Sequence, residues 1–260
     1  MEVYVSLLLI GLISGFAAGL FGIGGGVILV PAFSYFFSLK GVPKEIGFKL
    51  SVATSLSVIA VSTLFTSGFH ILKGKVSVGE ILRLMPFILL GISTGVLISH
   101  AVSGELLKKF FGLFLILLSL KILSGKGSGL KLPIRERLLV PLISLTSAFF
   151  SALLGIGGGV VVNTLMFSLS QRDVREVVAL ASVLSFVNAV FGTVLYSIVP
   201  AQKVLNYQVG YVYIPAALLV SIGGIAGSRL GLKFLHSTEQ KVLKKLFGLL
   251  LVVLGVKMFL

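Results

Sequence analysis

Two glycine-rich motifs carry the most specific chemistry in this sequence. Residues Gly22–Gly26 read Gly-Ile-Gly-Gly-Gly, and Gly155–Gly159 repeat the same five residues in a second apolar run. Glycine disfavours a continuous helix because it loses the most backbone freedom on folding, so each motif predicts a helix that breaks. The helix that resumes after a break starts with unpaired N–H groups and a positive dipole end, and such a start binds anions.

We therefore predict an anion site made from backbone amides at both breaks. Two breaks at corresponding places in one chain favour a transport site built from discontinuous helices. The alternative is a tight helix-packing or kink site that binds no ligand. The glycines assigned to the site are Gly22, Gly24, Gly25 and Gly26 in the first motif and Gly155, Gly157, Gly158 and Gly159 in the second.

Polar side chains near the motifs add hydrogen-bond donors that can replace the hydration shell of an oxyanion. Asn163 follows the second motif, where the first copy has Val30, so the two half-sites should not be equivalent. The alternative role for each polar residue is hydrogen bonding between helices, a common use of Ser and Thr in membranes. The side chains assigned to the site are Thr54, Ser55, Ser57, Asn163, Ser182, Ser185 and Asn188.

The sequence lacks the residues for a proton relay, a metal site or a phosphate-binding loop. All 8 carboxylates lie at the edges of apolar segments or in connections, so no acid is placed to relay protons in mid-membrane. The chain has no cysteine, and its 3 histidines lack the spacing of a metal site. Neither glycine motif is followed by the Gly-Lys-Ser/Thr of a phosphate-binding loop. We expect no enzyme activity, no metal and no cofactor.

The composition places these motifs in a membrane. Of 260 residues, 57% are hydrophobic and 12% are charged, against about 25% charged residues in soluble domains. Apolar stretches of membrane length follow one another with short polar breaks, which predicts an all-α, multi-pass helical membrane protein. The net charge of +14 comes from lysines and arginines in short connections, where they contact lipid headgroups. Without an aromatic-basic stripe we expect no nucleic-acid binding.

The sequence is an internal duplication with two homologous halves. Gly22–Val27 matches Gly155–Val160 at all six positions, and Lys108–Lys121 matches Lys244–Lys257 at 8 of 14 positions. We divide the chain into a first transmembrane repeat (1–123), a basic connecting loop (124–137) and a second transmembrane repeat (138–260). Further matches pair Lys44 with Arg172, and Pro86 with Pro215, where matching segments open.

Each half is predicted to hold a glycine-broken run followed by three plain spans. The run Val3–Leu39 would be about 55 Å long as a straight helix, well beyond the roughly 30 Å hydrocarbon core, so it folds back or crosses twice. With two crossings each half has five passages, including the re-entrant helices, and the halves are inverted; with one crossing each half has four and the halves are parallel. The five-plus-five arrangement puts about twice as many Lys and Arg on one side, so we favour it, with both termini outside. The predicted segments are Val3–Leu39, Ile46–Leu72, Glu80–Ser99 and Lys109–Leu123, then Leu138–Leu169, Val174–Val199, Gln208–Leu230 and Lys245–Leu260.

Two further glycine series have a simpler interpretation. Glycines at four-residue spacing let helices approach closely in membranes, so both series predict helix packing rather than a ligand site. The series are Gly11, Gly15 and Gly19, and Gly223, Gly227 and Gly231.

The twin motifs, the first followed by Val27–Pro31, resemble the sulfite exporter TauE/SafE family. The duplicated halves, the segment Ala53–Leu56 and the total length add to the resemblance, which covers nearly the whole chain. It implies an integral transporter of the prokaryotic inner membrane that moves small sulfur-containing anions such as sulfite, thiosulfate or organosulfonates.

Several alternatives stay open at this point. They include an anion channel or facilitator and a transporter of another small organic anion; a cation carrier is disfavoured by the missing acids. The expected partners are a small anionic substrate and membrane lipids. The sequence does not decide the substrate, the direction of transport, the coupling ion or whether copies associate into a homo-oligomer.

Overall fold

The protein is all-α apart from one two-stranded hairpin. The computed structural model describes residues 2–21, 25–124, 136–170, 172–237 and 240–259. The first half contains α1 (Glu2–Phe21), α2 (Gly26–Leu39), α3 (Lys44–Leu72), α4 (Val78–Ala101) and α5 (Gly104–Ser124). The second half contains α6 (Glu136–Leu154), α7 (Gly159–Leu169), α8 (Val174–Ile198), β1 (Gln208–Val209), β2 (Val212–Tyr213), α9 (Ile214–Ser237) and α10 (Gln240–Lys257).

Both glycine motifs separate two helices. The first lies between α1 and α2, and the second lies between α6 and α7, so neither predicted broken run is a continuous helix. Four of the described helices, α3, α4, α6 and α8, are long and apolar enough to cross a membrane, and shorter apolar stretches lie in α1, α2, α7 and α9. The all-α membrane fold class is confirmed; the number of crossings stays a prediction.

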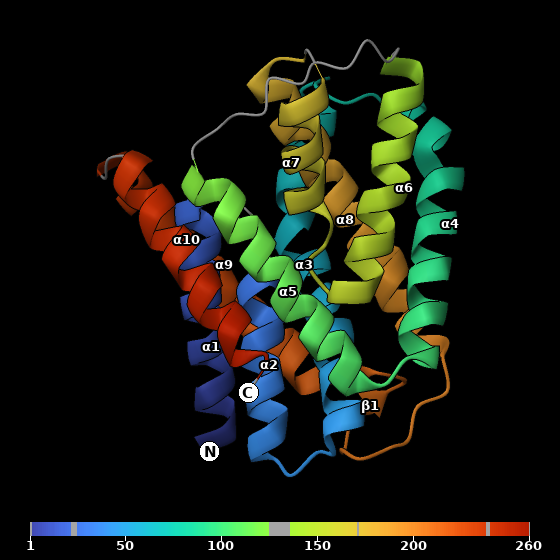
Figure 1. The fold of residues 1–260 in the computed structure, drawn as a ribbon, viewed down its shortest axis with the longest axis vertical. Coiled ribbons are helices and arrows are strands. Elements are labelled where there is room, and N and C mark those ends of the chain that lie inside the picture. Colours follow the sequence, from blue (N-terminus) through green and yellow to red (C-terminus); the bar gives the residue numbers. More distant parts are fainter. Residues whose placement is uncertain (1, 22–24, 125–135, 171, 238–239, 260) are drawn as a thin grey trace.

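The helices of the two halves pack in corresponding pairs. Helix α1 packs on α9 as α6 packs on α4, while α3 pairs with α8 and α5 pairs with α10. Corresponding helices also run in opposite directions along the bundle: α1 runs upward from the N-terminus, and α6 runs downward (Figure 1). This arrangement brings the two glycine motifs towards the same level of the bundle. The inverted orientation of the halves across a membrane stays a prediction.

Glycines allow the two outer pairs to pack closely. A Cβ on Gly11 would meet the Gly223 Cα at 3.0 Å, and one on Gly15 would meet the Gly224 Cα at 2.6 Å. Between α4 and α6, a Cβ on Gly95 would lie 2.7 Å from the Phe149 carbonyl oxygen. The predicted packing role of these glycines is therefore confirmed for α1 and α9, with the contacts of Gly19 and Gly231 outside the described residues.

The segment Gln208–Leu230 was predicted to be one helical span, and its first part is wrong. Residues 208–213 form the β1–β2 hairpin, and α9 begins only at Ile214. Tyr207 and Gly210 both have positive φ values, 61° and 53°, which a helix does not accommodate. Pro215 therefore lies in the first turn of α9, whereas its match Pro86 lies well inside α4, so the two segments do not open alike.

Helices α3 and α8 form the centre of the molecule. Leu50, Leu56, Leu180 and Leu184 on these helices are fully buried. A Cβ on Gly192 of α8 would lie 2.8 Å from the Leu56 side chain, so the two helices are in close contact. Both glycine motifs pack against this pair, and α3 and α8 therefore supply the side chains that face the breaks.

Candidate functional site

The second glycine motif is a sharp, tightly packed turn. Gly155, Gly157 and Gly158 have φ values of 68°, 74° and 82°, the left-handed region that residues with a Cβ rarely adopt. A Cβ on Gly155 would lie 2.8 Å from the Val52 Cα on α3, and one on Gly157 would lie 2.9 Å from the Ile59 side chain. This motif therefore needs glycine both for its backbone conformation and for its contact with α3.

The first motif contacts the second directly. A Cβ on Gly26 would lie 2.6 Å from the Ile156 Cα and 2.8 Å from the Gly155 oxygen. Gly25 precedes α2 in a right-handed conformation, and its carbonyl accepts the Leu29 amide at 2.9 Å. Gly22 and Gly24, both assigned to the site from the sequence, lie outside the described residues.

The N-termini of α2 and α7 meet at this contact. From the middle of the bundle α2 runs downward and α7 runs upward (Figure 1), so both point their positive dipole ends at the junction of the motifs. The first intrahelical bond of α7 joins the Val162 amide to the Gly158 carbonyl at 3.0 Å. The amides of Gly159, Val160 and Val161 have no hydrogen-bond partner among the described residues.

Helices α8 and α6 place polar side chains against the second motif. Asn188 of α8 is buried; its Nδ2 donates to the Gly157 carbonyl at 3.4 Å and to Ser147 Oγ at 3.5 Å, both long distances for hydrogen bonds. Ser185 Oγ contacts the position where a Cβ on Gly159 would stand. Asn188 and Ser185 therefore line the break, and their role in binding an anion stays a prediction.

Three polar atoms near the break lack partners. Asn188 Oδ1, Ser151 Oγ and Asn163 Oδ1 are buried and accept or donate no hydrogen bond within the described part of the chain. Ser151 lies one turn before the break, where its carbonyl accepts the Gly155 amide at 2.8 Å. Buried polar groups are nearly always paired, so this concentration of unpaired groups indicates that a polar partner belongs here.

The predicted site residues on α3 use their hydroxyls in hydrogen bonds within the protein. Ser55 Oγ donates to the Gly155 carbonyl at 2.8 Å, and Ser57 Oγ donates to the Thr54 carbonyl at 2.6 Å. Thr54 Oγ1 accepts the amide of Tyr213 in β2 at 3.1 Å. Ser55 therefore holds the turn of the second motif, and Thr54 holds the hairpin.

Ser182 and Asn163, two further predicted residues, make no hydrogen bond to either motif among the described residues. Ser182 is half-buried and donates to the Val178 carbonyl of its own helix at 2.9 Å. Asn163 lies one helical turn beyond Gly159 on α7 and is half-buried. Their inclusion in an anion site stays a prediction.

Sequence reasoning missed Ser147 and Ser151, which are fully buried on α6. Their four-residue spacing just before the second motif, and the match of Ser147 with Ser14 in the first half, could have indicated them. It also missed Lys49, a buried cation of α3 whose Nζ donates to the His100 carbonyl near the end of α4 at 2.8 Å.

An ion-pair network joins the helices at one end of the bundle. Arg172 Nη2 lies 3.0 Å from Glu80 Oε1, and Arg172 Nε lies 3.2 Å from Glu136 Oε2. Burial opposes the charge of the guanidinium, but Glu80 and Glu136 more than offset it, so the pKa of Arg172 is raised above its usual value. The network ties the α7–α8 connection to the starts of α4 and α6.

The β1–β2 hairpin packs on the opposite end. The Tyr211 amide donates to the Tyr196 carbonyl at 2.9 Å, and the Gln208 side chain accepts from the amides of Val204 and Leu205. Together with the bond from Tyr213 to Thr54, these contacts fix the hairpin beside α3. The two ends of the bundle are therefore held by different means, an ion-pair network and a hydrogen-bonded hairpin.

Metal chemistry has no support among the described residues. No group of three or more His, Asp or Glu side chains is gathered there in a way that could hold a metal ion.

Comparison with known proteins gives consistent results. A family model described as Sulfite exporter TauE/SafE matches residues 7–258. A probable membrane transporter protein of Methanocaldococcus jannaschii is 29% identical over 262 residues, covering 98% of this chain and 94% of that protein. A probable membrane transporter protein of Haemophilus influenzae is 28% identical over 262 residues, covering 97% of each. No solved structure matches the chain.

Proposed function

The chain belongs to the sulfite exporter TauE/SafE family of membrane transporters, and we propose that it carries small sulfur-containing anions, such as sulfite, thiosulfate or organosulfonates, at its paired glycine breaks. The family assignment gives the class of transporter.

The observation that carries the proposal is the meeting of two helix N-termini. Each end is equivalent to about half a positive elementary charge, so α2 and α7 repel one another at the contact of Gly26 with Ile156 unless negative charge compensates them. The described carboxylates lie in connections or near helix ends, as in the network of Arg172, and none supplies that charge. A bound anion would supply it.

The chemistry of the donors suits an oxyanion. The unpaired amides of Gly159, Val160 and Val161 donate from the backbone, and the hydroxyls of Ser151 and Ser185 add side-chain donors. Asn188 adds Nδ2, whose bonds to Gly157 and Ser147 are long. Hydrogen bonds to a charged group are worth about 1.5–3 kcal/mol each, so a few of them replace much of the hydration of a small anion. Because no lysine or arginine is needed, the anion can leave again.

Export needs no buried acid. An inside-negative potential favours outward movement of an anion by about 2.3 kcal/mol per charge for each 100 mV. The absence of an acid from the middle of the predicted spans therefore fits an exporter driven by the anion gradient and the potential. We place the transporter in the inner membrane, with the ion-pair network of Arg172 on the cytoplasmic side.

A channel is the second candidate, because backbone amides at a break would also suit a selectivity filter. Purified protein in proteoliposomes distinguishes the two, using a panel of sulfite, thiosulfate, sulfonates and carboxylates as test anions. A carrier gives saturable flux and counterflow with the anions it accepts, whereas a channel gives flux without counterflow. Equal flux of the carboxylates and the sulfur anions would contradict the proposed substrate class.

A further inference from the structure

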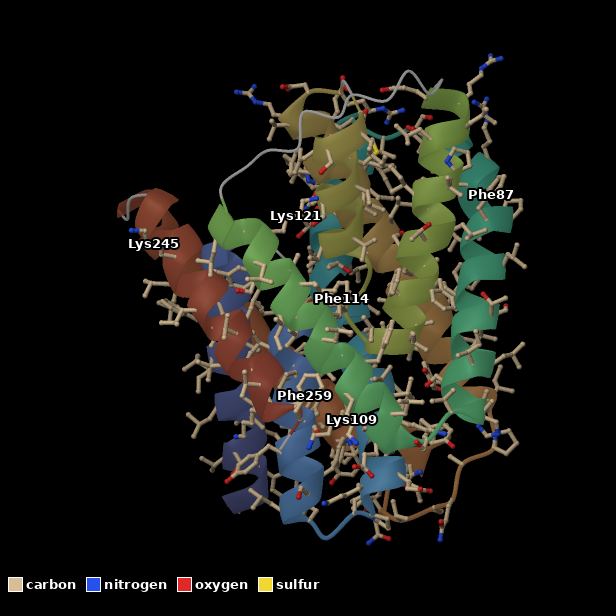
Figure 2. The ribbon with its side chains drawn as sticks, in the orientation of Figure 1. Phe87, Lys109, Phe114, Lys121, Lys245 and Phe259 are labelled. Carbon is tan, nitrogen blue, oxygen red and sulfur yellow. The ribbon has the colours of Figure 1, made fainter. Side chains whose placement is uncertain are left out.

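A polar cavity lies away from the glycine breaks, at the end of the bundle where α2 ends and where α3 and α5 begin. Its volume is about 100 Å³, roughly three water volumes, which suits a single tetrahedral oxyanion. Lys109 and Phe259, both of which line it, lie near each other on the lower part of the bundle (Figure 2). The polar residues that line the cavity are Ser34, Ser38, Lys44, Glu105, Lys108 and Lys109.

Close packing holds the walls of this cavity together. Gly104, the first residue of α5, has no room for a Cβ because the Glu45 carbonyl of α3 would contact it. Further along the two helices, the rings of Phe48 and Phe111 pack edge to face with centroids 5.9 Å apart. These contacts bring the starts of α3 and α5 together and set Lys44 and Lys108 on one cavity.

The cavity carries more positive than negative charge. Lys109 pairs with Glu105, with Nζ 3.5 Å from Oε1. Lys44 and Lys108 have no carboxylate partner among the described residues. Two cations on one cavity repel each other, so an anion bound between them lowers their free energy.

The matching cation of the second half differs from Lys44 in its partners. Arg172, which matches Lys44 in the duplication, has two carboxylate partners, Glu80 and Glu136. Lys44 forms no ion pair with a carboxylate among the described residues. A ligand from outside the chain would take the place of those acids.

Two hydroxyls of the cavity have no internal bonds. Ser34 and Ser38 lie four residues apart on α2, and neither hydroxyl makes a hydrogen bond within the described residues. Other helical serines of this chain, such as Ser51 and Ser144, donate to the carbonyl four residues earlier. Ser34 and Ser38 are therefore free to donate to a ligand.

We propose that this cavity binds a phosphate-type oxyanion between Lys44 and Lys108, with Ser34 and Ser38 as neutral donors. Phe48, Met258 and Phe259 give the cavity an apolar wall, and the site lies at the start of α3, a helix long and apolar enough to cross a membrane. The phosphodiester of an anionic phospholipid and a free oxyanion share the required chemistry. The site is separate from the glycine breaks and does not depend on the proposed substrate.

The test compares the protein with the double variant Lys44→Gln/Lys108→Gln. Native mass spectrometry from nanodiscs of phosphatidylglycerol and phosphatidylcholine reports the retained lipid, and thermal unfolding in detergent with inorganic phosphate reports the free ion. Loss of each lysine should weaken binding about 5-fold, because a lysine near an anionic headgroup raises the affinity by about that factor. Lys203→Gln is the matched control, since Lys203 is exposed on the connection at the same end and does not line the cavity.

Selective loss of phosphatidylglycerol from the double variant identifies the ligand as lipid. Loss of stabilisation by phosphate, without a change in retained lipid, identifies it as a free oxyanion. If the double variant does not fold, Ser34→Ala/Ser38→Ala is used in its place, with a smaller loss of the same ligand expected. Equal lipid retention and equal phosphate response in the variant and in Lys203→Gln would overturn the proposal.

Discussion

Gly26 of α2 lies against Ile156 of the second motif, so closely that a Cβ on Gly26 would come within 2.6 Å of the Ile156 Cα. Residues 130 positions apart thus form one backbone-to-backbone contact between the two halves of the duplication. Because backbone atoms cannot move aside as a flexible side chain can, this contact fixes how the two breaks face each other.

We expect Gly26→Ala to destabilise the protein by about 1–3 kcal/mol, the usual cost of overpacking. Thermal unfolding in detergent measures the effect. Gly68→Ala is the control, because Gly68 also lies in a helix but has nothing within 4 Å of its Cβ position, and there the better helix propensity of alanine should stabilise. Equal stability of the two variants would mean that the halves do not meet at Gly26.

Asn188→Ala should reduce sulfite flux about 10- to 100-fold, because it removes a donor to a charged group. Asn188→Asp should reduce it further, since it puts a negative charge where the anion is proposed to bind. Sulfite flux into proteoliposomes is measured for each variant and compared with that of the wild type. Thr193→Ala is the control on the same helix, where the hydroxyl only bonds the Ala189 carbonyl. Flux of Asn188→Asp equal to wild type would be inconsistent with anion binding at this residue.

Arg172→Gln should destabilise the protein by about 1 kcal/mol, since its ion pairs are partly exposed. The loss should shrink in 1 M salt, which screens exposed charges. Thermal unfolding at two salt concentrations measures both effects. Arg137→Gln removes a neighbouring exposed charge that has no ion pair among the described residues, and it should have little effect. A loss that does not depend on salt would exclude an electrostatic role for Arg172.

Thr54→Val should loosen the β1–β2 hairpin, because the Tyr213 amide loses its acceptor while the shape of residue 54 is kept. An unsatisfied buried donor costs about 1–3 kcal/mol. Hydrogen exchange at the Tyr213 amide should therefore speed up in Thr54→Val and stay near the wild-type rate in Thr54→Ser. Unchanged exchange in Thr54→Val would show that the hairpin is held by its other contacts.

The helix breaks and the packing glycines could be predicted from the sequence because they depend on local properties. Four glycines in an apolar run interrupt a helix wherever it lies, and glycines at four-residue spacing, such as Gly11 and Gly15, permit close approach to any partner helix. The bounds of α3 and α8 are also close to the predicted ones, because charged residues mark where both apolar runs begin.

The remaining features depend on contacts between distant segments. The hairpin at residues 208–213 has the apolar composition of a span, and only the positive φ values of Tyr207 and Gly210 interrupt it. The network of Arg172 joins the α7–α8 connection to the starts of α4 and α6, three segments far apart in the sequence. Ser55 was predicted to face an anion, but its partner is the Gly155 carbonyl, a pairing that the sequence does not contain.

Sulfite counterflow with Gly25→Leu and Gly158→Leu decides whether the paired glycine breaks bind the transported anion. Gly158 has a left-handed conformation against Ser147 and Asn188, and Gly25 caps α2, so leucine at either position fills the junction of the breaks. Size-exclusion chromatography establishes that each variant is folded before flux is compared with Gly68→Leu. Our account predicts saturable counterflow in the wild type and in Gly68→Leu, and its loss in the other two variants. Undiminished counterflow in folded Gly158→Leu would contradict it.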